Sequence, residues 1–198
     1  MVETLVAVGR TLGFTFAAGV NLYATIAIIG LASRYGWVSL PAEYSVFDND
    51  WVIGTALVLY VIEFFADKIP WLDSAWDAVH TAIRPLGGAF IAVTALGDAS
   101  PAAMVMAGLL GGTVAASSHF TKAGTRVVAN SSPEPFSNWI LSLAEDAFVV
   151  GLGYLALQHP LIALGVSATA LVLIAVFAAV IVRAIRRRFA KARAAAGG

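Results

Sequence analysis

The sequence predicts an all-α protein, a polytopic membrane helix bundle with about six spans, and three observations predict this fold class. Hydrophobic residues make up 60% of the 198 residues and charged residues 12%, whereas a typical soluble domain has about 25% charged residues. Apolar runs near the length of a membrane-spanning helix recur along the chain. The remaining charges are concentrated in short stretches, chiefly residues 63–84 and 183–193. Such a chain has too few polar residues to cover the surface of a soluble protein.

The first two predicted spans are residues 11–32 and 51–66. A polar connection separates them, and Pro41 makes this connection a loop. Pro70 then breaks the chain, because the proline ring clashes with the preceding helical turn.

A short amphipathic helix is predicted next, over residues 74–83, with Asp73 as its N-cap. Its polar side chains recur at helical spacing, so it either lies at the membrane surface or re-enters the membrane between other helices. Pro85 ends this helix, and residues 86–96 form a short third span.

The second half of the chain is predicted to hold three more spans. Residues 102–118, 139–158 and 161–182 are apolar runs of suitable length. A second polar connection, residues 119–138, joins the fourth span to the fifth. No cysteine is present, which excludes a disulfide framework and a thiolate metal site.

The C-terminal end is strongly basic and follows the last apolar run directly. We divide the chain into a single membrane domain, residues 1–185, and a basic cytoplasmic tail, residues 186–198. Such a cluster contacts anionic lipid headgroups more readily than nucleic acid. With six spans, the positive-inside rule places both termini in the cytoplasm. The cluster contains half of the chain's Lys and Arg: Arg183, Arg186, Arg187, Arg188, Lys191 and Arg193.

Four acids lie inside or at the end of predicted spans: Glu63, Asp67, Glu145 and Asp146. An ionised carboxylate inside a bilayer costs at least about 2.5 kcal/mol. These acids must therefore be paired, protonated, bound to a cation or in contact with water. One interpretation pairs them with neighbouring bases, and the other makes them a polar pathway or ion site. The candidate bases are Lys68, Arg84, Lys122 and Arg126.

Two polar pairs share a spacing of four residues. Asn21 and Thr25 lie on one helical face, and so do Asn138 and Ser142. We expect these side chains to line the path to the buried acids, or to serve only as hydrogen-bonding contacts between helices. The matching pattern also makes an inverted repeat, as found in many transporters, a candidate for this chain.

A candidate metal site follows from Asp73, Asp77 and His80, whose spacing puts three ligands on one helix face. Oxygen and nitrogen donors of this kind suit a divalent cation. The alternative is an interfacial helix with a solvated face, in which Asp77 pairs with Arg84.

Several stretches together resemble one bacterial membrane-protein family, the domain of unknown function 4126. The resemblance covers nearly the whole chain apart from the tail, and it implies a small polytopic protein of the bacterial inner membrane without assigned activity. The stretches are Gly19-Val-Asn21-Leu-Tyr23-Ala-Thr25, Asp67-Lys-Ile-Pro70, Asp77 through His80 to Arg84-Pro85, Lys122-Ala-Gly-Thr-Arg126, and Ser132-Pro-Glu-Pro-Phe-Ser-Asn138-Trp through Glu145-Asp146.

The function predicted from these patterns is a small transporter or channel, a homo-oligomer among membrane lipids, that moves a cation or a proton-coupled solute. Arg84, Lys122 and Arg126 gate its cytoplasmic mouth or contact an anion, together with Asp77 and His80. The first alternative is a membrane-embedded, metal-dependent enzyme acting on a lipid phosphate, and the second is a structural scaffold. The absence of the serine-hydrolase, zinc-protease and P-loop motifs favours a protein that is not an enzyme.

Overall fold

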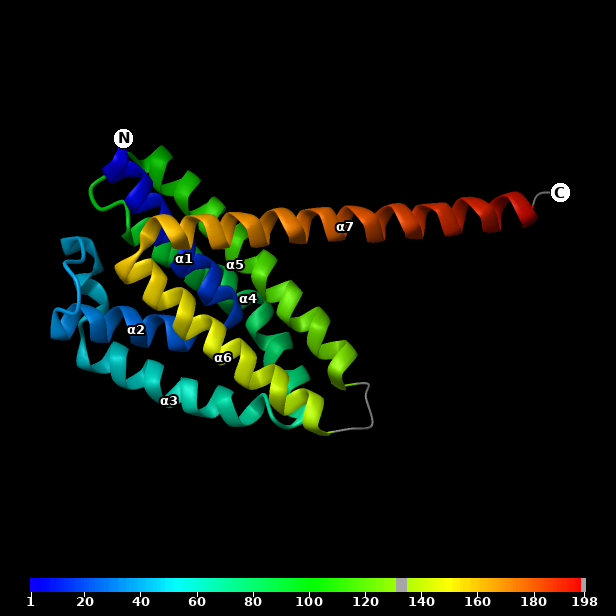
Figure 1. The fold of residues 1–198 in the computed structure, drawn as a ribbon, viewed down its shortest axis with the longest axis horizontal. Coiled ribbons are helices and arrows are strands. Elements are labelled where there is room, and N and C mark those ends of the chain that lie inside the picture. Colours follow the sequence, from blue (N-terminus) through cyan, green and yellow to red (C-terminus); the bar gives the residue numbers. More distant parts are fainter. Residues whose placement is uncertain (131–134, 197–198) are drawn as a thin grey trace.

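The computed structural model describes residues 1–130 and 135–196, and the side chains of residues 1–130 and 136–190. This part of the chain is helical and contains no strand, so the predicted all-α class is confirmed. Figure 1 shows a bundle from which the last helix projects. The elements are α1 (Val2–Val20), α2 (Leu22–Tyr35), the 3₁₀ helix η1 (Ala42–Phe47), α3 (Asp50–Ala66), α4 (Pro70–Thr94), α5 (Pro101–Asn130), α6 (Pro135–Gln158) and α7 (Pro160–Ala196).

Three helices in the described part are long and apolar enough to cross a membrane. They correspond to α5, to Phe136–Gln158 within α6 and to Pro160–Ala190 within α7. This number is lower than the six spans that the sequence predicts. The membrane bundle itself remains plausible, because α7 alone offers an apolar segment of mean hydropathy 2.6.

The first predicted span is not one helix, because the chain breaks at Asn21. This residue has an extended backbone, with φ −147° and ψ 100°, and its side-chain oxygen accepts a hydrogen bond from the amide of Ala24. Asn21 therefore ends α1 and caps α2, a position that asparagine favours. The prediction of an uninterrupted helix over residues 11–32 is wrong for this reason.

The reversal at Asn21 brings the outer ends of α1 and α2 to the same end of the bundle (Figure 1). Near that end, Arg10 of α1 donates to the carbonyl of Ala156, and Phe14 packs against Tyr44 of η1. The chain then crosses the bundle with each of the helices α3 to α7. The termini consequently lie at opposite ends of the molecule (Figure 1), and the cytoplasmic location of both stays a prediction.

Helix α4 is continuous where the sequence predicts two shorter elements. Pro70 occupies its first turn and Ile69 precedes it as the cap, so Asp73 is not the N-cap but a buried residue one turn further on. Pro85 lies inside the helix without ending it. Close packing on α5 holds this segment in place, because a Cβ atom at Gly88 would lie only 2.4 Å from the Cβ of Ala115.

Helix α5 is also longer than predicted, since it continues from residue 118 to Asn130. The polar stretch read as a connection over residues 119–138 forms three further helical turns and the start of α6. Its polar residues recur at intervals of three and four and point into the bundle, which explains why they do not end the helix. Residues 131–134, with the beginning of the family motif at Ser132, lie outside the described part.

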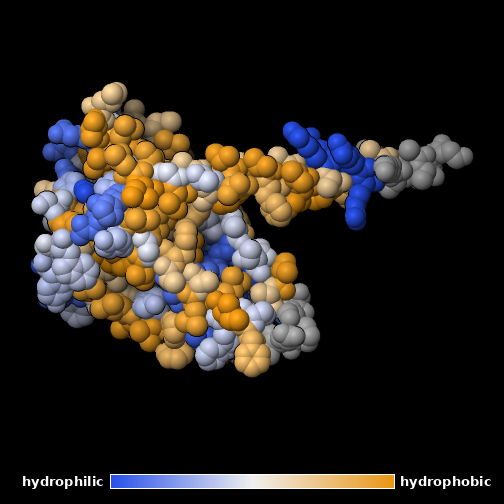
Figure 2. All heavy atoms as spheres, viewed as in Figure 1, coloured by the Kyte–Doolittle hydropathy of each residue, from blue (hydrophilic) through white to orange (hydrophobic). Residues whose placement is uncertain are grey.

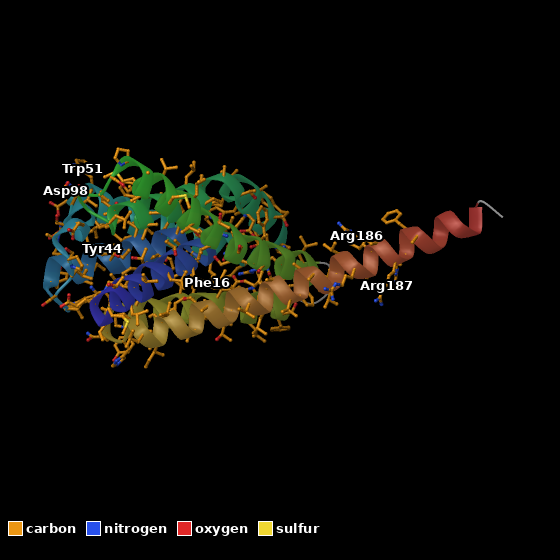
Figure 3. All side chains as sticks on the ribbon, turned by 90° about the horizontal axis from the view of Figure 1, so that it is seen from above. Phe16, Tyr44, Trp51, Asp98, Arg186 and Arg187 are labelled. Carbon is orange, nitrogen blue, oxygen red and sulfur yellow. The ribbon has the colours of Figure 1, made fainter. Side chains whose placement is uncertain are left out.

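The apolar core lies toward the end that carries the N-terminus. Helices α1, α2, α4, α6 and α7 contribute to this core with η1, and their side chains in it are almost completely buried. Figure 3 places Tyr44, Trp51 and Asp98 at this end and Phe16 near the middle of the molecule. The core side chains include Phe14, Ile29, Tyr44, Phe47, Ile91, Val149, Leu152, Ala156 and Ala163.

Helix α7 packs on the bundle only in its first part and then projects beyond it (Figure 1). Its apolar side chains stay exposed, with Leu173 63% and Phe177 68% exposed. Arg186 and Arg187 lie on the projecting part (Figure 3), where Figure 2 shows a hydrophilic cluster beyond an apolar stretch. The helix runs through residues 185 and 186 without interruption, so the expected boundary of the tail is not marked by a break.

Candidate functional site

The half of the bundle away from the N-terminus encloses a cluster of charged side chains, which we call the ionic network. It is built from the end of α3, the first half of α4, the second half of α5 and the first half of α6. Its members are Glu63, Asp67, Lys68, Asp73, Asp77, Arg84, Lys122, Arg126, Glu145 and Asp146.

Arg84 of α4 is the most enclosed cation of the ionic network. Its side chain is 0% exposed. One terminal nitrogen, Nη2, donates to Glu63 Oε1 at 2.7 Å, and the other, Nη1, donates to Asp77 Oδ1 at 3.1 Å. Arg84 thereby joins α3 to α4. Asp77 thus pairs with Arg84 as the second interpretation of this helix expected, but the face they share is buried and not solvated.

Two histidines next to Arg84 have hydrogen bonds that fit neutral rings. Arg84 Nη1 lies 2.7 Å from His119 Nδ1 and can only donate, so Nδ1 accepts and Nε2 carries the proton toward Thr81. In His80, Nδ1 faces the carbonyl of Trp76 at 2.7 Å and must donate, which leaves Nε2 to accept from the Tyr23 hydroxyl. Both histidines therefore act as neutral links between helices.

Lys122 and Arg126 lie one turn apart on α5 and bridge three other helices. Lys122 Nζ lies 2.9 Å from Asp67 Oδ2 and 3.4 Å from Glu63 Oε1. Arg126 Nη2 lies 2.5 Å from Glu145 Oε2 and 3.1 Å from Asp67 Oδ2. Arg126 Nη1 also donates to Asn138 Oδ1 at 2.8 Å. Each cation is thus shared between acids of different helices rather than matched to one partner.

Three members of the network are held more weakly. Asp73 accepts a hydrogen bond from the Asn130 amide at 2.7 Å and lies 3.8 Å from Arg126. From the described residues, Asp146 accepts one hydrogen bond, a long one of 3.4 Å from Asn21. The amine of Lys68 donates a hydrogen bond to the carbonyl of Phe64 and lies over the aromatic ring of Phe64. It also donates to the Ser142 hydroxyl at 3.3 Å.

The acids of the ionic network outnumber its bases. Six carboxyl groups face four cationic side chains, a surplus of two. Several buried carboxylate oxygens accept no hydrogen bond from the described residues. A buried ionised oxygen without a partner is costly, so the surplus must be met by protons, water or cations. These atoms are Glu63 Oε2, Asp67 Oδ1, Asp73 Oδ1, Asp77 Oδ2 and Asp146 Oδ2.

The predicted ligands of a divalent cation do not meet around one point. Asp73 turns to Asn130, Asp77 to Arg84 and His80 to Tyr23, although all three lie on one face of α4. No group of three or more acids and histidines able to hold a metal occurs among the described residues. The donor set therefore does not fit the metal. Helical spacing was an insufficient guide because Asp73 and His80 have partners on other helices, while Asp77 pairs with Arg84 of its own helix.

Two hollows approach the ionic network from different sides of α5. One, of about 220 Å³, lies between α4 and α5 and is lined in part by Asp73, Asp77 and Arg126. The other, of about 260 Å³, lies between α1, α5 and α6 and is lined in part by Lys122 and Glu145. Figure 2 shows hydrophilic atoms at the bottom of the notch between the bundle and the projecting part of α7.

The structure adds site residues that the sequence did not single out and displaces one that it did. Asn130 donates to Asp73 of the network, and Tyr23 and Thr81 bind the two histidines next to Arg84. Asn130 follows Arg126 by four residues, a spacing that would have indicated it if this stretch had been read as a helix. Thr25, by contrast, donates to the carbonyl of Asn21 in its own helix and does not reach the network.

The fold and the network define a class of protein: a helical bundle with three helices long and apolar enough to span a membrane, and with a charged interior. Within this class the chain belongs to the family described as Domain of unknown function (DUF4126), whose model matches residues 8–182. This match confirms the family indicated by the sequence motifs. No curated protein and no solved structure matches the chain significantly.

Proposed function

We propose that this protein is a membrane transporter or channel that moves protons or small cations through the ionic network. The observation that carries the proposal is the surplus of two carboxyl groups over cationic groups in a buried cluster. A surplus acid in a low-dielectric environment binds a proton or a cation, and can release it when its surroundings change. Such groups are the usual components of ion pathways in membranes.

The shared pairing of the network supports movement rather than simple structural support. Buried ion pairs contribute little net stability compared with apolar side chains of the same size, because taking charges out of water is costly. Here Arg84, Lys122 and Arg126 each face acids from more than one direction. Each of these cations can therefore leave one carboxylate while it stays paired with another. Such an exchange of partners is what a gate in an ion pathway requires.

The carriers of the ions are Asp73 and Asp146 in this proposal. They have the weakest pairings among the acids of the network, and each has a carboxylate oxygen without a hydrogen bond. Asp73 also lines the hollow between α4 and α5. Asp146 lies beside Asn21, where the reversal between α1 and α2 points the N-terminus of α2 at the network, and broken helices of this kind surround the binding sites of many transporters.

The placement in the bilayer follows from α7. Its apolar part, residues 160–182, is about 35 Å long at 1.5 Å per residue, close to the thickness of the hydrocarbon core. The basic residues beginning at Arg183 then emerge on one side, which the positive-inside rule makes the cytoplasmic side of a bacterial inner membrane. The C-terminus is cytoplasmic in this placement, and the N-terminus lies at the opposite face.

The pairing within the ionic network gives less support to the alternative function, a membrane-embedded enzyme that acts on a lipid phosphate. An enzyme of that kind needs cationic side chains that are free to bind phosphate. Arg84, Lys122 and Arg126 are at most 4% exposed, and all three are already paired with carboxylates. The exposed apolar surface of α7 fits a homo-oligomer in lipid, which we retain as part of the proposal.

A flux assay tests the proposal. The purified protein is reconstituted into vesicles, and proton, Na⁺ and K⁺ fluxes are followed after a diffusion potential is imposed. We expect flux above that of empty vesicles, and Asp146→Asn should reduce it strongly, because this change removes the ionisable group and keeps the shape. Asp98→Asn, at an exposed loop position, is the matched control and should leave flux unchanged. Absence of all three fluxes in the folded protein would contradict the proposal.

A further inference from the structure

The hollow between α1, α5 and α6 has the features of a ligand site that opens sideways. Its walls are apolar, with Phe16 of α1 and Phe148 of α6 forming an edge-to-face pair at 6.0 Å. Its floor reaches the ionic network at Glu145. Helices α5 and α6 touch at few positions, and α7 packs only lightly on α5, so the opening faces the region that lipid occupies in a bilayer.

Glu145 is the acid that a ligand in this hollow would meet. Its side chain is 12% exposed, whereas those of Glu63 and Asp67 are 0% and 3% exposed. Lys122 also lines the hollow, and its amine lies 2.9 Å from Asp67 Oδ2, 3.4 Å from Glu63 Oε1 and 3.7 Å from Glu145 Oε2. The amine is thus held among three carboxylates, and the carbon stem of the lysine lines the hollow beside Glu145.

The charge of the surroundings selects a cation. The ionic network behind Glu145 has two more acids than bases, so its field attracts positive charge and repels negative charge. The aromatic faces at the hollow add to this attraction, because a cation over a phenyl ring is stabilised by the ring's quadrupole.

From these observations we propose that the hollow binds a small apolar organic cation, a quaternary ammonium, that enters from the lipid between α5 and α6. This inference rests on the proposed transport function and names its substrate class. Both oxygens of Glu145 already accept hydrogen bonds from Arg126. A quaternary ammonium has no N–H group that needs an acceptor, so it can lie against this occupied carboxylate without losing hydrogen bonds.

The size of the hollow sets an upper limit on the ligand. A volume of about 260 Å³ lies just below the range of about 300 to 1,000 Å³ that is usual for small-molecule sites. It accommodates one phenyl ring with a trimethylammonium group and excludes cations that carry several rings. Thr121 and Thr125 line the hollow without turning it into a strongly polar site.

A binding experiment tests this inference independently of flux. Radiolabelled benzyltrimethylammonium is bound to the purified protein in nanodiscs, and neopentylbenzene, which has the same shape with carbon in place of nitrogen, is the neutral competitor. We expect saturable binding of the cation with little competition by the neutral compound. Glu145→Gln should weaken binding on the order of tenfold, which corresponds to about 1.4 kcal/mol.

A second variant keeps the test decisive if Glu145→Gln disturbs folding. Ala144→Phe fills the hollow without changing any charge and should abolish binding, while Ala147→Phe, an exposed position on α6 outside the hollow, should not. Absence of saturable binding, or equal competition by neopentylbenzene, would overturn the inference. Either result leaves the flux assay unaffected, so failure of the substrate class and failure of the transport function are distinguishable.

Discussion

The two ends of the bundle have cores of opposite character, although the same helices build both. Helix α4 contributes Ile91 to the apolar core and Arg84 to the ionic network, and α6 contributes Val149 and Glu145 in the same way. Ile91 and Arg84 are both 0% exposed. The two ends are therefore not distinguished by how deeply their side chains are buried. They are distinguished by whether the buried side chains are apolar or charged.

The comparison separates stability from function. An apolar core gains stability from close packing alone. An ionic core loses stability through the desolvation of its charges, and regains it only while its ion pairs are intact. A second apolar core would hold these helices together at lower cost. We infer that the ionic end is retained for what its charges do, and four variants test this contrast.

The largest effect is expected from Arg84→Ala in the ionic network. The change leaves Glu63 and Asp77 as buried acids without their main partner, so unfolding free energy should fall by about 3–5 kcal/mol. Unfolding in mixed micelles, followed by circular dichroism, measures it. Arg84→Lys keeps the charge and should lose less. If the free energy of unfolding of Arg84→Ala falls by less than about 1 kcal/mol, the pairs of Arg84 with Glu63 and Asp77 contribute little to stability, contrary to this prediction.

The apolar end should lose stability without losing function. Phe14→Ala removes a fully buried ring that packs edge-on against Tyr44 at 5.9 Å, and the cavity should cost about 3 kcal/mol. Ion flux per folded molecule should stay near that of the unchanged protein. A specific loss of flux in this variant, at equal amounts of folded protein in the vesicles, would contradict the separation of the two ends.

The reversal between α1 and α2 lies where the two ends meet, and its variant should have a smaller effect. Asn21→Ala removes the side-chain oxygen that caps α2 at 2.9 Å, which should cost about 1 kcal/mol. It also removes the hydrogen bond to Asp146. Flux should therefore change more than stability does. Asn21→Ser, which keeps a capping oxygen and adds no charge beside Asp146, should retain more of the stability and serves as the control.

The smallest effect is expected from Arg34→Ala, outside the candidate spans. Arg34 Nε lies 2.8 Å from Asp48 and Nη1 lies 2.6 Å from Asp50. The hydrogen bonds that Arg34 donates to these two carboxylates raise the pKa of Arg34, but water surrounds the pairs and screens them. Neither the unfolding transition nor the flux should change measurably. A clear loss of flux would show that function extends to the apolar end.

The sequence predicted the helical class and the charged residues of the site, but not the course of the helices. Composition and apolar runs were sufficient for the class, and α3 and α6 begin and end close to the predicted limits. Buried bases on α5 were read as the mark of a loop, because polar residues are ordinarily exposed. Only their partners on other helices show that these residues belong to a buried helix, and partners distant in sequence leave no local pattern.

Asn21 and the metal prediction illustrate the same limit. Asparagine in an apolar run is compatible with a continuous helix, so the break became visible only with its extended backbone and its cap to Ala24. The spacing of Asp73, Asp77 and His80 correctly put them on one face of α4. It also offered the pairing of Asp77 with Arg84 on the same helix as the alternative. It could not show that Asp73 and His80 would bind Asn130 and Tyr23, which come from other helices.

The most direct test of the central claim compares two matched double variants in the flux assay. Asp73→Asn with Asp146→Asn removes the two most weakly paired acids of the ionic network, and Asp50→Asn with Asp98→Asn removes two exposed acids near the other end. We predict that the first pair abolishes proton and cation flux in folded protein and that the second pair leaves it intact. Equal flux in the two double variants would contradict the account.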